Sequence, residues 1–188
     1  MGWCGRMKGF SVSKLILLLL IAVSLDLRAY SLAPASFENL QSAILTLNFL
    51  ESLPSNGPIV VGVIYTSDIP GSKSIATETA NAMSAMRGPN SRILQPIVLS
   101  LNDLDRFQGR LDVIFLEPGV SMHPERVLVA TGRLHAVSIS ADPVCMDSRC
   151  CVLLVRSGQQ VEISLNTSLA SAIGARFSMV FMMVVKRR

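Results

Sequence analysis

Three cysteines in the last third of the chain are the residues whose type and spacing most readily suggest chemistry. They are Cys145, Cys150 and Cys151, while the fourth cysteine of the 188-residue chain, Cys4, lies near its start. Cys145 and Cys150 are spaced for a local disulfide across a loop before a strand, if the protein is exported to an oxidising compartment. Cys151 has three open roles: a small buried hydrophobic residue, a partner of Cys145 in place of Cys150, or an exposed reactive or intermolecular thiol.

The other polar residues form no recognisable catalytic or metal-binding motif. Zinc ligands usually occur as spaced pairs, and neither His123 nor His135 lies beside the cysteines in the sequence. Asp103, Asp105 and Asp112 alternate with arginines around a short predicted helix, which is typical of a solvated, salt-bridged face. The sequence contains no nucleophile elbow, phosphate loop, dinucleotide-binding fingerprint or zincin motif. We therefore expect neither an enzyme nor a metal or other cofactor.

The first residues have the pattern of an export signal. Arg6, Lys8 and Lys14 precede an unbroken apolar run of nine residues, 15–23, and small residues at 29–31 offer a cleavage site. Nine helical residues cover only about half of a bilayer's hydrocarbon core. We predict a signal peptide over residues 1–31 and a periplasmic protein, with an uncleaved N-terminal anchor as the alternative.

Composition and charge narrow the choice of partners. The chain is 50% hydrophobic and carries a net charge of +4. Removal of residues 1–31 leaves 13 basic and 12 acidic residues, so the remaining domain has a net charge of +1. Because no basic stripe interleaved with aromatic residues remains, we expect no nucleic-acid partner.

Apolar periodicity predicts alternating helices and strands after the leader. Helical spacing with caps and breakers indicates helices at 37–50, 72–86, 101–107, 124–130 and 168–173. Apolar, β-branched runs indicate strands at 59–65, 93–99, 112–116, 136–140, 151–156 and 160–165. The segment 178–185 fits either a strand or a buried helical turn. Pro96 favours an edge position for its strand, and either Ser100 or Asn102 caps the helix that follows it. Asn166 and Gly174 mark the two ends of the last helix.

This alternation predicts a single α/β domain over residues 37–186. Strands that alternate with helices across short loops favour a mostly parallel sheet flanked by helices. The last two strands are joined by Ser157 and Gly158, which predicts a C-terminal strand hairpin followed by a short helix.

The chain resembles the YfiR family of small exported bacterial proteins. In the C-terminal half, the resemblance rests on the cysteine-rich loop, the strands 150–155 and 161–166, the Ala- and Gly-containing helix 170–175, and Phe177 and Ser178 leading into the apolar end. In the N-terminal half it rests on the first helix, Pro54, and the strand 59–65 with Gly62. It covers residues 37–186.

The resemblance implies a regulator that acts by binding. The best-known members sit in the periplasm and hold an inner-membrane diguanylate cyclase inactive, and an outer-membrane lipoprotein can sequester them. Cyclic di-GMP levels and biofilm formation respond through this relay. The resemblance also implies a homodimer and a disulfide between Cys145 and Cys150, while the first-half cysteines of some members have no counterpart here.

Two apolar segments are candidate surfaces for such a partner, one in the turn 116–122 and one at the apolar C-terminal end. Their candidate contact residues are Glu117, Val120 and Met122 in the first, and Phe177, Met179 and Phe181 in the second. The alternative interpretation of the second segment is an ordinary part of the core.

A second hypothesis is a periplasmic binding module for a small ligand, resembling half of a periplasmic binding protein. Such a module would hold its ligand in a cleft at the carboxyl ends of the strands. The residue pairs expected there are Ser67 and Asp68, Glu117 and Pro118, and Ser140 and Ala141.

Overall fold

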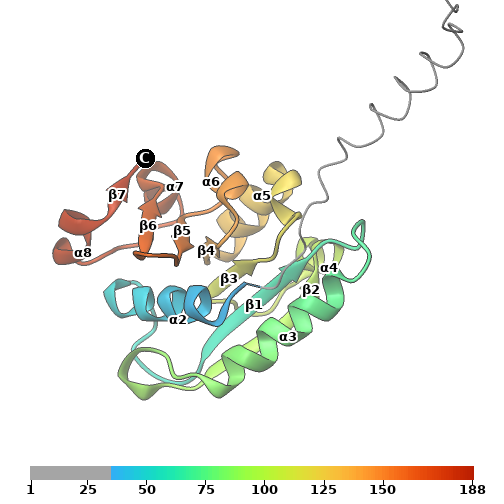
Figure 1. Cartoon of the computed structure of the whole chain (residues 1–188), viewed down its shortest axis with the longest axis horizontal. Helices are drawn as coiled ribbons and strands as arrows, with labels where there is room; N and C mark the ends of the chain where they lie inside the picture. Colours follow the sequence, from blue (N-terminus) through green and yellow to red (C-terminus); the bar gives the residue numbers. More distant parts are fainter. Residues whose placement is uncertain (1–34) are drawn as a thin grey trace, which may run out of the picture. The chain divides into compact units, whose positions relative to one another are not determined.

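Strands and helices alternate along residues 35–188, the part of the chain that the computed structural model describes (Figure 1). The strands are β1 (Ile59–Tyr65), β2 (Leu94–Ser100), β3 (Val113–Leu116), β4 (Val137–Ser140), β5 (Leu153–Arg156), β6 (Glu162–Leu165) and β7 (Lys186–Arg187). The α-helices are α2 (Phe37–Thr46), α3 (Ser72–Ala85), α4 (Leu101–Arg106), α5 (Pro124–Leu134), α6 (Pro143–Asp147), α7 (Thr167–Ala172) and α8 (Met179–Val184). Short 3₁₀ helices are η1 (Leu47–Phe49), η2 (Pro89–Ser91) and η3 (Val120–Met122). The leader predicted over residues 1–31 lies outside the described residues.

The strands form one sheet in the order β2-β1-β3-β4-β5-β6-β7. Strands β1 to β5 run parallel, β6 is antiparallel to β5, and β7 is parallel to β6. The prediction of a single α/β domain with a mostly parallel sheet and a C-terminal hairpin is therefore confirmed. Strand β2 lies at an edge and pairs with β1 alone. Pro96, which has no N–H to donate, is tolerated there because no strand lies on the other side of β2.

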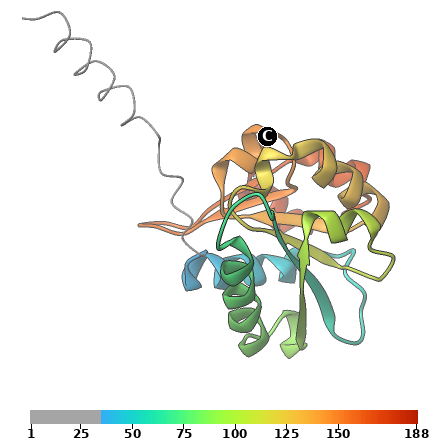
Figure 2. The ribbon, with the colours of Figure 1, turned by 90° about the vertical axis from the view of Figure 1, so that its right-hand side faces the viewer.

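Side chains of the central strands alternate between two apolar cores, one on each face of the sheet. Val63 and Phe115 pack into the core that holds residues of α2 and α3. Ile64 and Ile114 pack into the other core, with residues of α4, α5 and α6. Figure 2 shows α2 and α3 on one side of the sheet and α4 and α5 on the other. Burial on both faces explains why these strands are apolar along their length.

The predicted caps stop and start the helices at the expected residues. Ser100 accepts a hydrogen bond from the Asp103 amide at 3.1 Å, and Asn166 accepts one from the Leu169 amide at 2.9 Å. Gly174 follows α7 with a left-handed φ of 74°. These short-range signals are satisfied by neighbours within the same segment, so they can be interpreted without the tertiary fold.

Three helices differ from the sequence prediction. Helix α5 continues to Leu134, four residues further than expected, and ends where His135 adopts a left-handed φ of 50°. Helix α6 occupies the predicted cysteine loop, because Asp142 caps it and Pro143 suits its first turn. The segment 178–185 contains α8, whose Phe181 is buried and whose other side chains are largely exposed. Among residues 35–188 no helix combines the length and apolarity needed to cross a membrane.

Candidate functional site

The chain connections diverge at the carboxyl edge of the sheet between β1 and β3. Strand β1 pairs in parallel with β2 on one side and with β3 on the other. The loop after β1 leads to α3 on one face of the sheet, whereas the loop after β3 leads to α5 on the other face. The loops after β1 and β3 therefore leave the sheet in different directions, which is the usual place for a ligand crevice in open α/β sheets.

The residue pairs of the binding-module hypothesis all lie at this edge. Ser67 and Asp68 follow β1, Glu117 and Pro118 follow β3, and Ser140 and Ala141 end or follow β4. Since β1, β3 and β4 are neighbours, the sheet brings the three pairs together. The prediction that these pairs follow neighbouring strands at one edge is thus confirmed, and a ligand cleft between them stays a prediction.

A contact between His123 and Asp68 joins the first two loops across the diverging connections. Nε2 of His123 lies 3.1 Å from a carboxylate oxygen of Asp68, and Asp68 is largely exposed. The loop after β1 is held in place because the Thr66 hydroxyl accepts a hydrogen bond from the Asp68 amide at 3.3 Å. The Ser72 hydroxyl, at the start of α3, donates to the Thr66 carbonyl. An acid and an imidazole from two different loops are therefore held side by side at the carboxyl edge.

Close packing between the loops requires a glycine after β3. Gly119 has a left-handed φ of 89°, and a Cβ at this position would collide with the side chain of Ile69 in the loop after β1. Only a residue without a side chain meets both conditions at little cost. Gly119 therefore sets how closely the two loops approach.

The loop after β4 is tied to β3 by a hydrogen-bond network. The Ser140 hydroxyl donates to the Leu116 carbonyl at 3.1 Å and accepts from the Asp142 amide at 3.1 Å. The Ser121 hydroxyl donates to a carboxylate oxygen of Asp142 at 2.7 Å, and the other carboxylate oxygen caps α6 at Val144. This network fixes the far side of the edge, as a preformed binding site requires.

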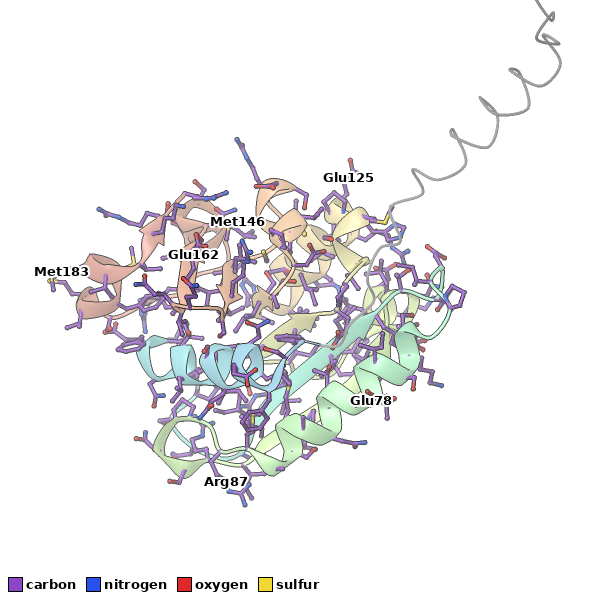
Figure 3. All side chains as sticks on the ribbon, viewed as in Figure 1. Glu78, Arg87, Glu125, Met146, Glu162 and Met183 are labelled. Atoms are coloured by element: carbon purple, nitrogen blue, oxygen red, sulfur yellow. The ribbon has the colours of Figure 1, made fainter. Side chains whose placement is uncertain are left out.

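A hollow lies directly beside the His123–Asp68 contact. It has a volume of about 360 Å³ and is lined by Met122, His123, Pro124, Glu125 and Arg126 at the start of α5. Figure 3 shows the labelled Glu125 side chain pointing outward from this end of α5. The volume suits a small metabolite. Larger hollows of about 440, 660 and 800 Å³ lie elsewhere on the domain.

Glu117 is buried just after β3, so its assignment to a partner surface was wrong. Its side chain is 1% exposed, and neither carboxylate oxygen has a hydrogen-bond partner within residues 35–188. Burial raises its pKa from 4.5 to about 7, and the nearby Thr79 hydroxyl, which does not reach hydrogen-bonding geometry, lowers the pKa by a smaller amount. Position 117 has the same parity as Val113 and Phe115, which turns its side chain towards α3, and the sequence did contain this signal.

The other candidate contact residues divide between core and surface. Val120 and Phe181 are buried, so both were wrong as surface residues, because η3 and α8 turn them into the two cores. Met122 and Met179 are exposed by 65% and 79%, and Phe177 is half-buried. Only one side of each segment therefore remains available to a partner.

The three cysteines gather in a buried cluster on the α6 side of the sheet. The sulfurs of Cys145 and Cys150 are 2.9 Å apart and are free thiols, so their disulfide stays a prediction. A hydrogen bond with Cys145 lowers the pKa of the Cys150 thiol to about 7, helped by the Ser148 hydroxyl, whereas burial raises the pKa of Cys145. Cys151 is completely buried, which contradicts the exposed-thiol alternative.

Comparisons with known proteins support the fold alone. No family model and no curated protein matches the sequence. Among solved structures, the chain is similar to the ABC domain in complex with L-Trp from Streptococcus pneumonia, with 10% identity, a TM-score of 0.54, and coverage of 80% of this chain and 60% of that one. It is also similar to the ligand-free, open structure of CD0873, a substrate binding protein with adhesive properties from Clostridium difficile, with 11% identity, a TM-score of 0.47, and coverage of 69% and 54%. The chain thus spans less than two thirds of either protein.

Proposed function

We propose that the protein is a binding domain for a small ligand, which it holds at the carboxyl edge of the sheet between the loops after β1 and β3. The observation that carries the proposal is the divergence of the chain at β1 and β3, with the Asp68–His123 pair and a hollow beside it. The similar fold of a domain that was crystallised with L-Trp supports a small polar metabolite as the ligand class. Such a role agrees with the predicted export to the periplasm.

A thermal-shift screen of amino acids and other small metabolites tests this proposal. A ligand at about 100 times its Kd stabilises the folded state by about 2.7 kcal/mol, which is a readily measured rise in Tm. Asp68→Asn should remove most of the rise, because it weakens the Asp68–His123 contact beside the hollow. Glu162→Gln is the matched control, since Glu162 is also an exposed acid in an ion pair, but it lies on β6. The proposal is wrong if no compound raises the Tm, or if both variants respond like the wild type.

We propose as a second function the regulation of an inner-membrane signalling protein such as a diguanylate cyclase, with an outer-membrane lipoprotein as a further partner. The observation in its favour is the apolar side of α8, where Met179, Val180, Met183 and Val184 are exposed by 61–79%. Apolar side chains grouped on one surface of a domain are typical of protein interaction sites. The resemblance to the YfiR family names the class of partner.

Intracellular cyclic di-GMP in the source bacterium tests this second function. Deletion of the gene should raise the level, and only a copy that retains residues 1–31 should restore it. Restoration should fail with Met183→Ser, which removes an exposed apolar side chain from α8, and should succeed with Val129→Ser, which does the same on α5. An unchanged level after deletion would contradict regulation of a cyclase.

A further inference from the structure

A second candidate binding site lies at the opposite edge of the sheet, where the parallel strands begin. It is a hollow of about 660 Å³ between α5, α6 and α7, bounded by residues just before β5 and just after the antiparallel β6. Small-molecule sites typically have volumes of about 300–1,000 Å³. Because this hollow shares no residue with the carboxyl edge, an inference from it does not depend on the function proposed above.

One wall of this hollow is apolar. Leu128 comes from α5, Met146 from α6, and Leu169 and Ala172 from α7. Met146, labelled in Figure 3, is 4% exposed and forms part of the core on the α5 and α6 side. A methionine side chain adapts its shape to what it contacts. The wall therefore suits a short aliphatic or aromatic group.

The other wall offers hydrogen-bond donors. Within residues 35–188 no acceptor pairs with the guanidinium of Arg149, although this residue lines the hollow. The Asn166 side chain is mostly buried, and its oxygen accepts from the Leu169 amide, which leaves its NH₂ group as a donor. The one carboxylate of the lining, on Asp147, is already 3.3 Å from a guanidinium nitrogen of Arg188. Arg149 is exposed at the rim of the hollow, and its guanidinium and the Asn166 amide are two donors suited to an acceptor with negative charge.

The backbone at Arg149 is held in an uncommon conformation. Its φ is 59°, in the left-handed region that a residue with a side chain seldom adopts. The Arg149 amide donates to the Met146 carbonyl at 3.1 Å, which ties this residue to the end of α6. The turn therefore fixes the base of the arginine beside the apolar wall, and such local strain is often found at ligand sites.

We propose that this hollow binds a small amphipathic anion, with its apolar part on α5, α6 and α7 and its negative group on Arg149. A short-chain carboxylate has this chemistry, and hexanoate is a suitable probe. A cation of the same shape is excluded by Arg149 and Arg188, because their charges would repel it.

Methyl NMR of the purified chain, labelled with ¹³C at its methionine methyl groups, tests the proposal. Titration with hexanoate should move the Met146 signal in a saturable way, and the Met146→Leu variant identifies that signal. The Met183 signal should not move, because Met183 lies on α8 and points away from the body of the domain (Figure 3). Hexylamine should leave both signals in place.

The charge requirement is tested with a matched pair of arginine variants. Arg149→Gln should weaken hexanoate binding by about tenfold or more, as expected for loss of a hydrogen bond to a charged group. Arg187→Gln should bind like the wild type, because Arg187 is exposed on β7 and does not line the hollow. The proposal fails if Met146 shows no saturable shift, if hexylamine binds as well as hexanoate, or if the two variants bind equally.

Discussion

Replacement of Glu117 by glutamine removes a buried carboxyl whose protonation depends on folding. In the folded protein, burial raises the pKa of this carboxyl to about 7, whereas its ordinary value is 4.5. The folded state therefore holds the proton more tightly than the unfolded chain does. The stabilisation that results is fully present below pH 4.5 and is lost as the pH rises towards 7.

The size of the effect follows from the two pKa values. A rise from 4.5 to about 7 corresponds to about 3 kcal/mol at about 1.4 kcal/mol for each tenfold change in proton affinity. From about pH 5 to about pH 8, the wild type should lose about 2–3 kcal/mol of unfolding free energy relative to Glu117→Gln. The variant should be the more stable protein at the alkaline end, unless its buried amide costs more than the charge it replaces. The cost of the buried amide is the same at every pH, so it does not change how the difference in unfolding free energy varies with pH.

Urea unfolding at a series of pH values measures this difference directly. Glu78→Gln is the matched control, because Glu78 is exposed on the outer side of α3, next to Thr79 in the sequence (Figure 3). The control should follow the wild type across the whole range. Parallel curves for Glu117→Gln and the wild type would refute the reasoning, since they would mean that the carboxyl titrates alike in the folded and unfolded states.

Three further predictions concern packing and the cysteine pair. Gly119→Ala should destabilise the fold by more than about 1 kcal/mol, because φ is 89° and the new Cβ would collide with Ile69 in the neighbouring loop. Gly132→Ala in α5 has open space around the new Cβ and should stabilise the fold by about 0.5–1 kcal/mol. Chemical unfolding measures both changes. Mild oxidation should join Cys145 to Cys150, whose sulfurs are 2.9 Å apart, and stabilise the fold by about 2 kcal/mol; peptide mapping with and without reductant detects the bond, and its absence would contradict the pairing. Phe181→Ala should cost about 3–5 kcal/mol, because the ring is 2% exposed and stacks on two other phenylalanines; a loss near zero in the same assay would place this ring outside the core.

The order and type of most elements could be predicted from the sequence, because they depend on short-range signals. The run 59–65 is apolar and rich in β-branched residues, and it forms the interior strand β1 with the predicted bounds. Pro96 indicated the edge strand, and Ser100 and Asn166 cap the helices expected after them. Each of these effects arises within a few residues of chain, so it can be predicted from the sequence without the tertiary structure.

The grouping of the residue pairs at the proposed ligand site also followed from the sequence, because parallel strands bring their carboxyl ends to one edge. Asp68 and Ser140 are more than 70 positions apart in the chain, yet they follow or end strands that the sheet places near one another. The prediction of a mostly parallel sheet was enough to place these residues at the same edge. It could not supply the Asp68–His123 pair, which depends on the conformations of two loops.

Tertiary structure decided which groups meet and which side chains of the short segments η3 and α8 face solvent. The sequence suggested Val120 and Phe181 as contact residues for a partner, but the packing of η3 and α8 buries both side chains. The hollow beside Arg149 is built from three helices that are distant in the sequence, so no local pattern could reveal it. The sequence by itself determined the order of the elements and the apolar faces that they must bury, because these depend on neighbouring residues. The tertiary structure decided burial, pKa and the shape of each site, because these depend on contacts between distant segments.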